Sequence, residues 1–305
     1  MNEKNEEIIK YIEDLLDVSN SNLDSSLILF DKKKYPESLF LLQQSIEKST
    51  KAMGLFFGGI KKKHLEKKVG HDLLKIYEYS LKKLICKNNK FLKIMSKNPQ
   101  LRKVDLLKTV DRNKLNIELE SLLNQLNIIR KEKDRIGTTS RDLDRYLSKI
   151  IKFFKEKEKA LQELQNLTIT DRQFQQARKK MISSLLQLKN ISKKIYSEEY
   201  EKTISSIEKL DKQFVINKVK ETFSYIIPPF TIYIISLYLS IIIFPHSVSK
   251  TRYPDFKNPN KFYTLSKPIL KKFSRIAKLQ KKCIKEIYLI IQNYKKMMLK
   301  EKKKK

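Results

Sequence analysis

Apolar residues in the first third of the chain recur every three or four positions, which is the spacing of one helix face. This pattern predicts a helix from Pro36 to about Phe57, because proline suits the first helical position and Gly58-Gly59 stop the helix. Its apolar face contains Leu39, Leu42, Ile46, Met53 and Phe57. A second helix is predicted after Gly70, and two earlier ones around residues 8–18 and 23–34.

The middle of the chain has a different pattern, because leucine and isoleucine keep a seven-residue repeat over residues 115–129 and again over 143–164. The segment Gly137 to Ser140 between them joins a helix stop to cap-forming residues. Two helices that turn back on each other as an antiparallel coiled coil are therefore expected. A further helical pair, at about residues 171–196 and 198–220, would extend this arm.

Residues 222–249 contain no charged side chain, and the core of this segment, 223–245, is long enough to span a bilayer. Two interpretations compete. The segment is a single transmembrane helix with tyrosine anchors, or it is a helix buried at the centre of a bundle, with Pro228-Pro229 at its entry and Pro245 at its end.

Composition favours an all-α chain. Five glycines and eight prolines in 305 residues are too few for barrels, sandwiches or dinucleotide-binding folds, and no glycine follows Gly137. The two cysteines form neither a disulfide framework nor a metal-binding pair, and the acidic start of the chain is not a secretory signal. We therefore expect a cytoplasmic protein, or a single-pass membrane protein if 223–245 spans a bilayer.

The net charge of +32 is unevenly distributed. Residues 1–86 hold 15 basic and 13 acidic side chains, whereas residues 87–220 hold 32 and 17, and residues 221–305 hold 19 and 4. Such a positive field attracts nucleic acid or anionic lipid. However, 56 of the 66 basic residues are lysines, which equally fits a compositional bias toward lysine.

Three stretches together resemble the HEPN (higher eukaryotes and prokaryotes nucleotide-binding) family. The first is residues 43–53, in which a Gln-Gln turn leads into Glu47-Lys48 and Lys51-Ala52. The second is residues 70–74, with His71-Asp72-Leu73, and the third is residues 251–255, with Arg252-Tyr253-Pro254-Asp255.

The resemblance implies an HEPN-like helical bundle split by a long insertion. Its first half would be residues 1–90 and its second half residues 222–305, with a coiled-coil arm inserted over 91–221. Since both halves must pack together, the resemblance favours a buried core helix over a transmembrane helix at 223–245.

Ribonucleases of this family use an arginine followed four to six residues later by a histidine on one helix. Here His64 and His71 have no arginine upstream, and His246 has none within the preceding 50 residues. Lys61 to Lys63 could stand in ahead of His71, but lysine lacks the bidentate geometry of arginine. The family's ribonuclease activity is therefore not transferred, and no catalytic residue, metal ligand or cofactor is predicted.

The candidate residues for binding a nucleotide or a partner are Lys51, His71, Arg252 and Asp255. Each has a structural alternative. Glu47 and Lys51 can form an ion pair on an exposed helix face, His71-Asp72 can cap a helix, and Arg252 and Asp255 can clamp a turn.

The sequence thus predicts a non-catalytic HEPN-like protein that binds a nucleotide, RNA or a protein partner. The resemblance implies a prokaryotic defence or toxin–antitoxin type system, with a homodimer or a nucleotidyltransferase-type protein as possible partners. The alternative is a membrane-anchored coiled-coil protein with a tethering role.

Overall fold

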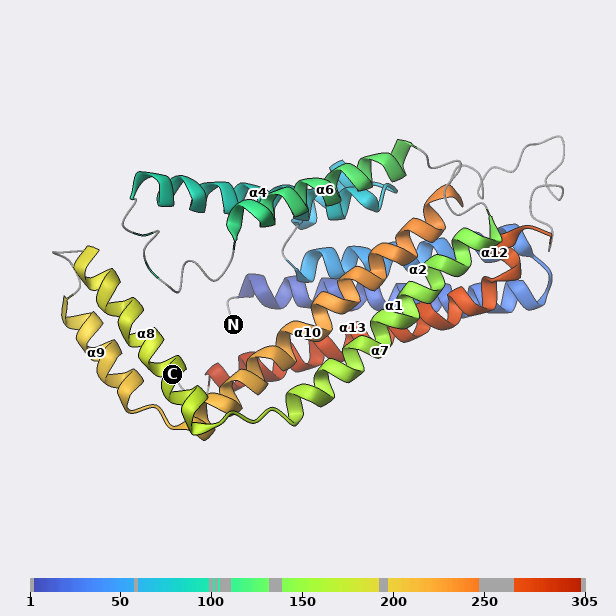
Figure 1. Ribbon diagram of the computed structural model, residues 1–305. Helices are drawn as coiled ribbons and strands as arrows, with labels where there is room; N and C mark the ends of the chain where they lie inside the picture. The colour runs from blue at the N-terminus through green and yellow to red at the C-terminus, as the bar shows by residue number, and fades with distance from the viewer. Residues whose placement is uncertain are drawn as a thin grey trace. The chain divides into compact units, whose positions relative to one another are not determined.

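The computed structural model describes residues 3–57, 60–98, 101, 104, 111–131, 139–191, 197–246 and 266–302 (Figure 1). These residues are largely helical and include no strand, so the predicted all-α class is confirmed. The longer helices are α1 (Glu3–Asp31), α2 (Tyr35–Phe56), α4 (Leu74–Lys97), α6 (Arg112–Lys131), α7 (Ser140–Gln165), α8 (Asp171–Ile191), α9 (Ser197–Glu208), α10 (Lys212–Ile243) and α13 (Phe273–Lys302). Short helical segments are α3 (Lys62–His64), a π-helix (Leu65–Val69), a 3₁₀ turn (Phe244–His246) and α12 (Pro268–Lys271).

The chain forms two compact units. Unit 1 contains residues 1–80, 123–160 and 225–305, and unit 2 contains residues 81–122 and 161–224. The predicted inserted arm, residues 91–221, coincides with neither unit, because residues 123–160 belong to unit 1.

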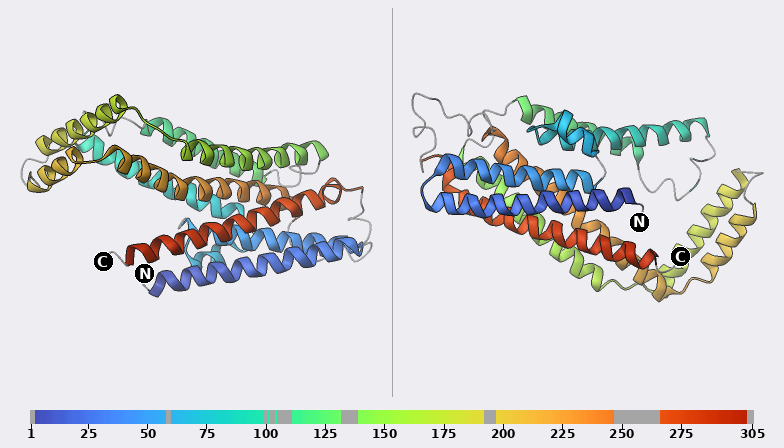
Figure 2. Two further views of the ribbon diagram at one scale, coloured as in Figure 1. Left: turned by 90° about the horizontal axis from the view of Figure 1, so that it is seen from below. Right: turned by 180° about the vertical axis from the view of Figure 1, so that it is seen from behind.

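The centre of unit 1 is a layer of three long helices, in which α1 and α2 pack closely as a hairpin and α13 packs on both (Figure 2). Buried positions on α1 follow helical spacing, with Ile9, Ile12, Leu16 and Leu23 all at or below 5% exposure. On α2 the predicted core residues Leu39, Leu42, Ile46 and Met53 are buried, whereas Phe57 is 40% exposed.

A buried polar network ties the three helices together. The side-chain amide of Gln280 on α13 donates hydrogen bonds to the hydroxyls of Ser45 (3.1 Å) and Ser49 (2.9 Å) on α2. The Ser19 hydroxyl of α1 donates to the Ser45 carbonyl at 2.7 Å. Because all four side chains are buried, a shift of one helix along another would leave polar groups unpaired, and the network therefore fixes the helix register.

Helix α10 is long and apolar enough to cross a membrane by length and composition, and half of its most apolar window is buried in the structure. Within unit 1 its polar side chains bond to other helices. Ser240 lies 3.1 Å from Thr50 of α2, Tyr233 donates to Ser80 of α4 at 2.7 Å, and Ser236 lies 3.6 Å from the thiol of Cys283 on α13. Burial raises the pKa of Tyr233 and that of Cys283 to about 12, so both groups stay neutral.

Two prolines lie inside α10, although the sequence pattern places them at the entry of the helix. Pro228 and Pro229 follow sixteen residues of helix that begin at Lys212. The helix begins earlier because Asp211 caps it, with its carboxylate accepting the backbone N–H of Phe214 at 2.8 Å. The predicted helix 198–220 is consequently divided, and α9 ends at Glu208.

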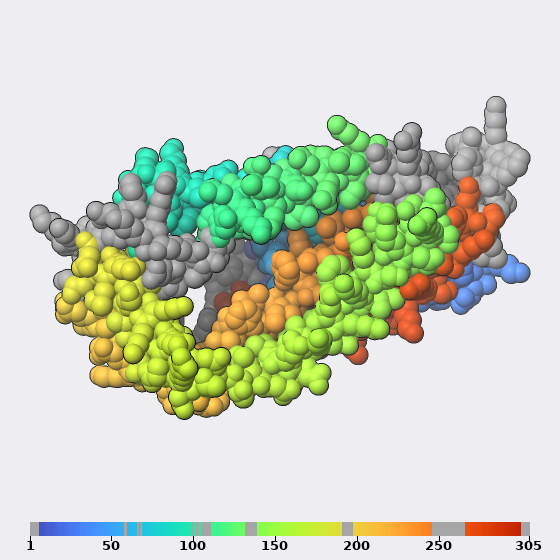
Figure 3. Space-filling view, viewed as in Figure 1, coloured from blue at the N-terminus to red at the C-terminus, as the bar shows by residue number. Residues whose placement is uncertain are grey.

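Helix α7 packs in unit 1 beside α10, and Figure 3 shows the two next to each other on one face. The ring of Tyr238 on α10 lies 6.0 Å from that of Tyr146 and 5.7 Å from that of Phe153. Lys157, the polar position of the predicted seam, is only 6% exposed and pairs with Glu286 of α13 at 2.6 Å. The buried stripe of α7 therefore serves α10 and α13.

The seam of α6 differs from that of α7. Leu119 and Leu126 are buried, but Leu122 is 48% exposed. The polar contacts of α6 are to α4 and to Asp72 just before it, and none among the described residues joins α6 to α7. The heptad pattern thus marks a buried stripe on α7 but only two buried positions on α6, and the partners of the α7 stripe differ from those of the predicted coiled-coil hairpin.

Unit 2 contains the α8–α9 hairpin, in which the two helices pack on each other. A capping box starts α8, with the hydroxyl of Thr170 accepting the N–H of Gln173 and the Gln173 side chain accepting the N–H of Thr170. In the other part of this unit, Asn88 of α4 donates to the Arg112 carbonyl and to the side chain of Asn116 on α6. The Arg112 guanidinium lies 4.5 Å from the centre of the Phe91 ring.

Candidate functional site

The structure brings together two of the four predicted site residues at a single buried carboxylate. Glu47 of α2 is 2% exposed, and its two oxygens contact Lys51 (Nζ, 2.6 Å) and His71 (Nδ1, 3.0 Å). The predicted Glu47–Lys51 pair is therefore present, but its expected exposure is wrong for Glu47, because other elements cover this face of α2. Arg252 and Asp255, the other two predicted residues, lie outside the described residues.

Gly70 allows the chain to bring His71 back to α2. Its φ of +55° with ψ of −121° belongs to a region that side-chain-bearing residues rarely adopt. The turn places His71 three residues before α4, where it reaches a carboxylate 24 positions earlier in the chain. A single glycine thus assembles the Glu47–Lys51–His71 group.

The carboxylate of Glu47 stays ionised although it is buried. Burial tends to raise the pKa of Glu47, but the Lys51 ammonium and the contact with His71 outweigh this effect and hold the pKa below its ordinary value. A carboxylate only accepts hydrogen bonds, so Nδ1 of His71 carries the proton toward Glu47. The ring of His71 is 58% exposed, which leaves its other nitrogen available to a ligand.

Arg130 of α6 adds a second charged group next to the first. Its Nε lies 3.0 Å from Asp72, the neighbour of His71, and its Nη1 donates to Glu78 of α4 at 2.9 Å. The carboxylate of Asp72 therefore pairs with Arg130. Sequence reasoning missed Arg130 because it searched for an arginine before each histidine, whereas Arg130 follows His71 by 59 positions.

The cluster Glu47, Lys51, His71, Asp72, Glu78 and Arg130, which we call the α2–α4 cluster, contains three carboxylates and three basic side chains. Each basic group is already held by at least one carboxylate. Such a set can hold helices together and can offer the exposed nitrogen of His71 as an acceptor to a ribose hydroxyl or a base. Lys62, one of the lysines considered as a stand-in for arginine, lies 4.3 Å from the centre of the Tyr11 ring on α1.

The α2–α4 cluster lies wholly inside a family match. Residues 12–160 match the family model described as the HEPN domain. The chain carries a HEPN domain. This match confirms the resemblance seen in residues 43–53 and 70–74, and the HEPN family links the chain to nucleotide- or RNA-related functions. No curated protein and no solved structure matches the chain.

The HEPN match is continuous and ends at Ala160, so it includes α6 and most of α7. Residues 251–255, the third stretch of the resemblance, lie outside it. The matched range therefore includes Lys51 and His71 but neither Arg252 nor Asp255.

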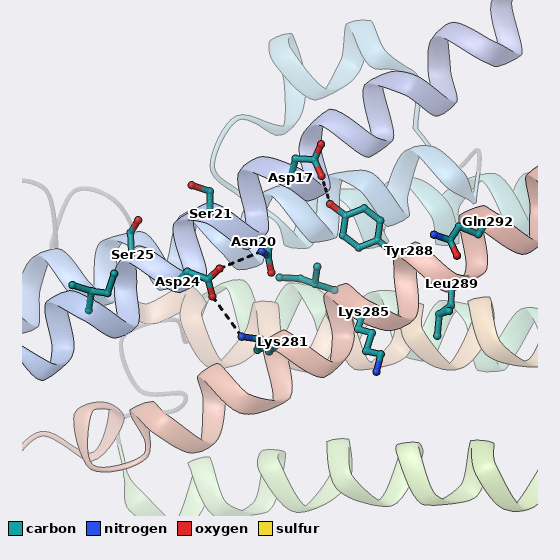
Figure 4. A pocket seen from close by; sticks show the side chains of 12 residues that line it. Asp17, Asn20, Ser21, Asp24, Ser25, Lys281, Lys285, Tyr288, Leu289 and Gln292 are labelled. Carbon is teal, nitrogen blue, oxygen red and sulfur yellow. Dashed lines mark hydrogen bonds and ion pairs between the residues drawn. The ribbon is translucent and has the colours of Figure 1, made fainter.

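A groove of about 710 Å³ lies elsewhere in unit 1, between α1 and α13 (Figure 4). Its acidic side chains come from α1 and its lysines from α13, and they pair across it, with Asp24 lying 3.6 Å from Lys281 and Tyr288 bonded to Asp17. The rim exposes Ile28 at 56% and Leu289 at 44%. Its charged side chains thus largely neutralise one another, and its lining includes none of the four predicted residues.

Proposed function

We propose that this protein binds RNA through its HEPN domain without cleaving it. The convergence of Lys51 and His71 on Glu47, inside the matched domain, is the observation that carries the proposal. The half-exposed His71 ring turns its second nitrogen away from Glu47, where it can accept a hydrogen bond from a ribose hydroxyl or a base. The net charge of +32 adds the long-range attraction that nucleic-acid binding needs.

We expect no cleavage because no free arginine accompanies His71 among the described residues. The arginine four to six residues before a histidine, which the family's ribonucleases use, is missing from this sequence. Arg130 lies near His71 because it pairs with Asp72, the next residue in the chain. However, the carboxylates of Asp72 and Glu78 hold its guanidinium at 2.9–3.0 Å. A guanidinium neutralised in this way is a poor partner for the phosphate of a transition state.

The test uses full-length protein and a 20-nucleotide single-stranded RNA of mixed sequence. Fluorescence anisotropy should show binding at 50 mM salt that weakens by about 300-fold or more at 200 mM, if six or more phosphates are contacted. The RNA should remain intact on a denaturing gel. Replacing His71 by Asn should weaken binding by about 2- to 12-fold, the equivalent of one hydrogen bond, without lowering the melting temperature.

Two results would contradict the proposal. Absence of RNA binding at 50 mM salt would remove RNA as the ligand. Cleavage by the wild type that disappears in His71→Asn would establish a ribonuclease and overturn the non-catalytic assignment. Lys278→Ala, at an exposed position of α13, serves as the control that should leave affinity unchanged.

A second candidate function is membrane anchoring, and the length and composition of α10 favour it. Ile226 (52%) and Phe230 (58%) are exposed on this helix. Carbonate extraction of cell membranes distinguishes the candidates, because an anchored protein stays in the pellet and an RNA-binding bundle is released. The polar contacts of Tyr233, Ser236 and Ser240 with other helices of unit 1 support release.

A further inference from the structure

The second half of α4 has an unusual distribution of charge. From Tyr79 to Val104 the chain contains no acidic residue, but it contains seven lysines and one arginine. Six of these lysines lie on α4, at positions 82, 83, 87, 90, 93 and 97. At about 100° per residue they fall within an arc of about 140°, along about 22 Å of helix.

The packing of α4 in unit 2 turns these lysines outward. Asn88 and Phe91, on the opposite side of the helix, contact Arg112 and Asn116 of α6. Lys87, Lys90, Lys93 and Lys97 are all exposed, and within the described part of the chain no ion pair is formed by these four. We call these four residues the lysine face.

Several lysines elsewhere in the protein are paired, unlike those of the lysine face. Lys281 and Lys282 of α13, and Lys272 directly before this helix, pair with carboxylates of α7 or α1 at 2.8–3.6 Å. The lysine face instead keeps its full positive charge, with lysines every three or four residues, or about 4.5–6 Å along the axis.

We propose that the lysine face binds the phosphate backbone of RNA. The inference rests on the proposed RNA binding and names a second contact surface for it, in unit 2. The four lysine ammonium groups in a row release condensed counterions when they meet a polyanion. Binding here is independent of base sequence, because the nearby Phe91 ring is covered by Arg112 and no aromatic ring on the face is free to stack on a base.

An anionic membrane is the less favoured ligand for this face. Helices that lie on membranes bury a wide apolar side in the lipid. Two large apolar side chains of α4, Leu84 (50%) and Ile94 (54%), are exposed, which is far less than a wide apolar side.

Cys86 provides a probe in the middle of this row of lysines. It lies between Lys83 and Lys87, is a free thiol and is exposed, whereas Cys283 is free but fully buried. Maleimide should therefore label the folded wild type at Cys86. Saturating RNA should slow this labelling by about tenfold or more if the backbone lies along the lysine face.

The decisive variant replaces Lys87, Lys90, Lys93 and Lys97 by Gln. Glutamine has nearly the same helix propensity as lysine, so α4 should remain helical. For single-stranded RNA, losing four phosphate contacts should reduce the slope of log affinity against log salt concentration by about 3 in magnitude. The ratio of wild-type to variant affinity should therefore rise about 50-fold when the salt is lowered from 200 to 50 mM. The matched control removes the same charge from exposed positions in α12 and α13, at Lys271, Lys278, Lys285 and Lys296.

The outcomes separate the two proposals. If the wild type binds no RNA, the proposed function fails. If it binds RNA but Cys86 labelling is unchanged and both quadruple variants behave alike, RNA binding stands and the lysine face is not its site. If the lysine-face variant loses binding to vesicles that contain phosphatidylserine while keeping RNA affinity, the face is a membrane contact and the inference is overturned.

Discussion

Replacing Glu47 by Gln tests how the α2–α4 cluster is held together. The change preserves the shape of a side chain that is 2% exposed but removes the charge that faces Lys51 at 2.6 Å. Lys51 is itself only 13% exposed, so in the variant its ammonium would face a neutral amide oxygen instead of a carboxylate in a largely dry site. A hydrogen bond to a charged group contributes about 1.5–3 kcal/mol, and the contact with the half-exposed His71 adds little. We expect the free energy of unfolding to fall by about 2 kcal/mol.

The pH dependence of this effect has a defined sign. The pKa of Glu47 is lower in the folded protein than its ordinary value of 4.5, so the stabilisation is fully present above about pH 4.5. It is lost as the pH falls through the folded pKa. Urea unfolding followed by circular dichroism should therefore show wild type and Glu47→Gln converging in stability below pH 4.5.

Glu198→Gln is the matched control, because Glu198 forms the same kind of pair one helical turn from Lys202 at 3.2 Å, but both side chains are at least 75% exposed. It should change stability by less than about 0.5 kcal/mol. If Glu47→Gln is as mild as this control at pH 7, or if its effect grows on acidification, the argument from a buried, ionised Glu47 is wrong.

Three further substitutions probe the packing. Gly54→Ala should cost about 1–3 kcal/mol, because a Cβ there would lie 2.6 Å from a methyl group of the buried Ile76, and thermal unfolding should show a lower melting temperature. Lys33→Gly should raise the free energy of unfolding in urea by up to about 1 kcal/mol, since Lys33, two residues after the end of α1, has a φ of +60° that glycine adopts more readily. A lower free energy of unfolding would contradict this. Ile150→Ala should cost about 2–5 kcal/mol while Leu122→Ala costs much less, and equal losses would refute the different burial of the two seams.

Local signals in the sequence predict helices well but do not predict the partners of those helices. Pro36 lies in the first turn of α2, and the apolar stripe of that helix is buried as expected. The heptad repeats of α6 and α7 also mark buried positions. However, a stripe specifies only which face is covered, and in the structure α10 and α13 cover the stripe of α7.

The candidate site was only partly predicted from the sequence, because local patterns do not reveal long-range contacts. Lys51 and His71 belong to short motifs that are readable in sequence. Arg130 contributes through a contact 52 to 58 residues away along the chain, and no local spacing marks such a contact. The burial of Glu47 likewise depends on how other elements cover α2, which the repeat of a single helix does not reveal.

The network around Gln280 also determines when unit 1 can be completed during synthesis. Gln280 bonds to Ser45, which lies 235 residues earlier in the chain. A ribosome adds about 5–20 residues per second, so the α1–α2 hairpin exists for roughly 10–50 s before α13 arrives. During that time its row of serines and its apolar face stay uncovered, and the nascent chain is a natural client for a chaperone until the last long helix leaves the ribosome.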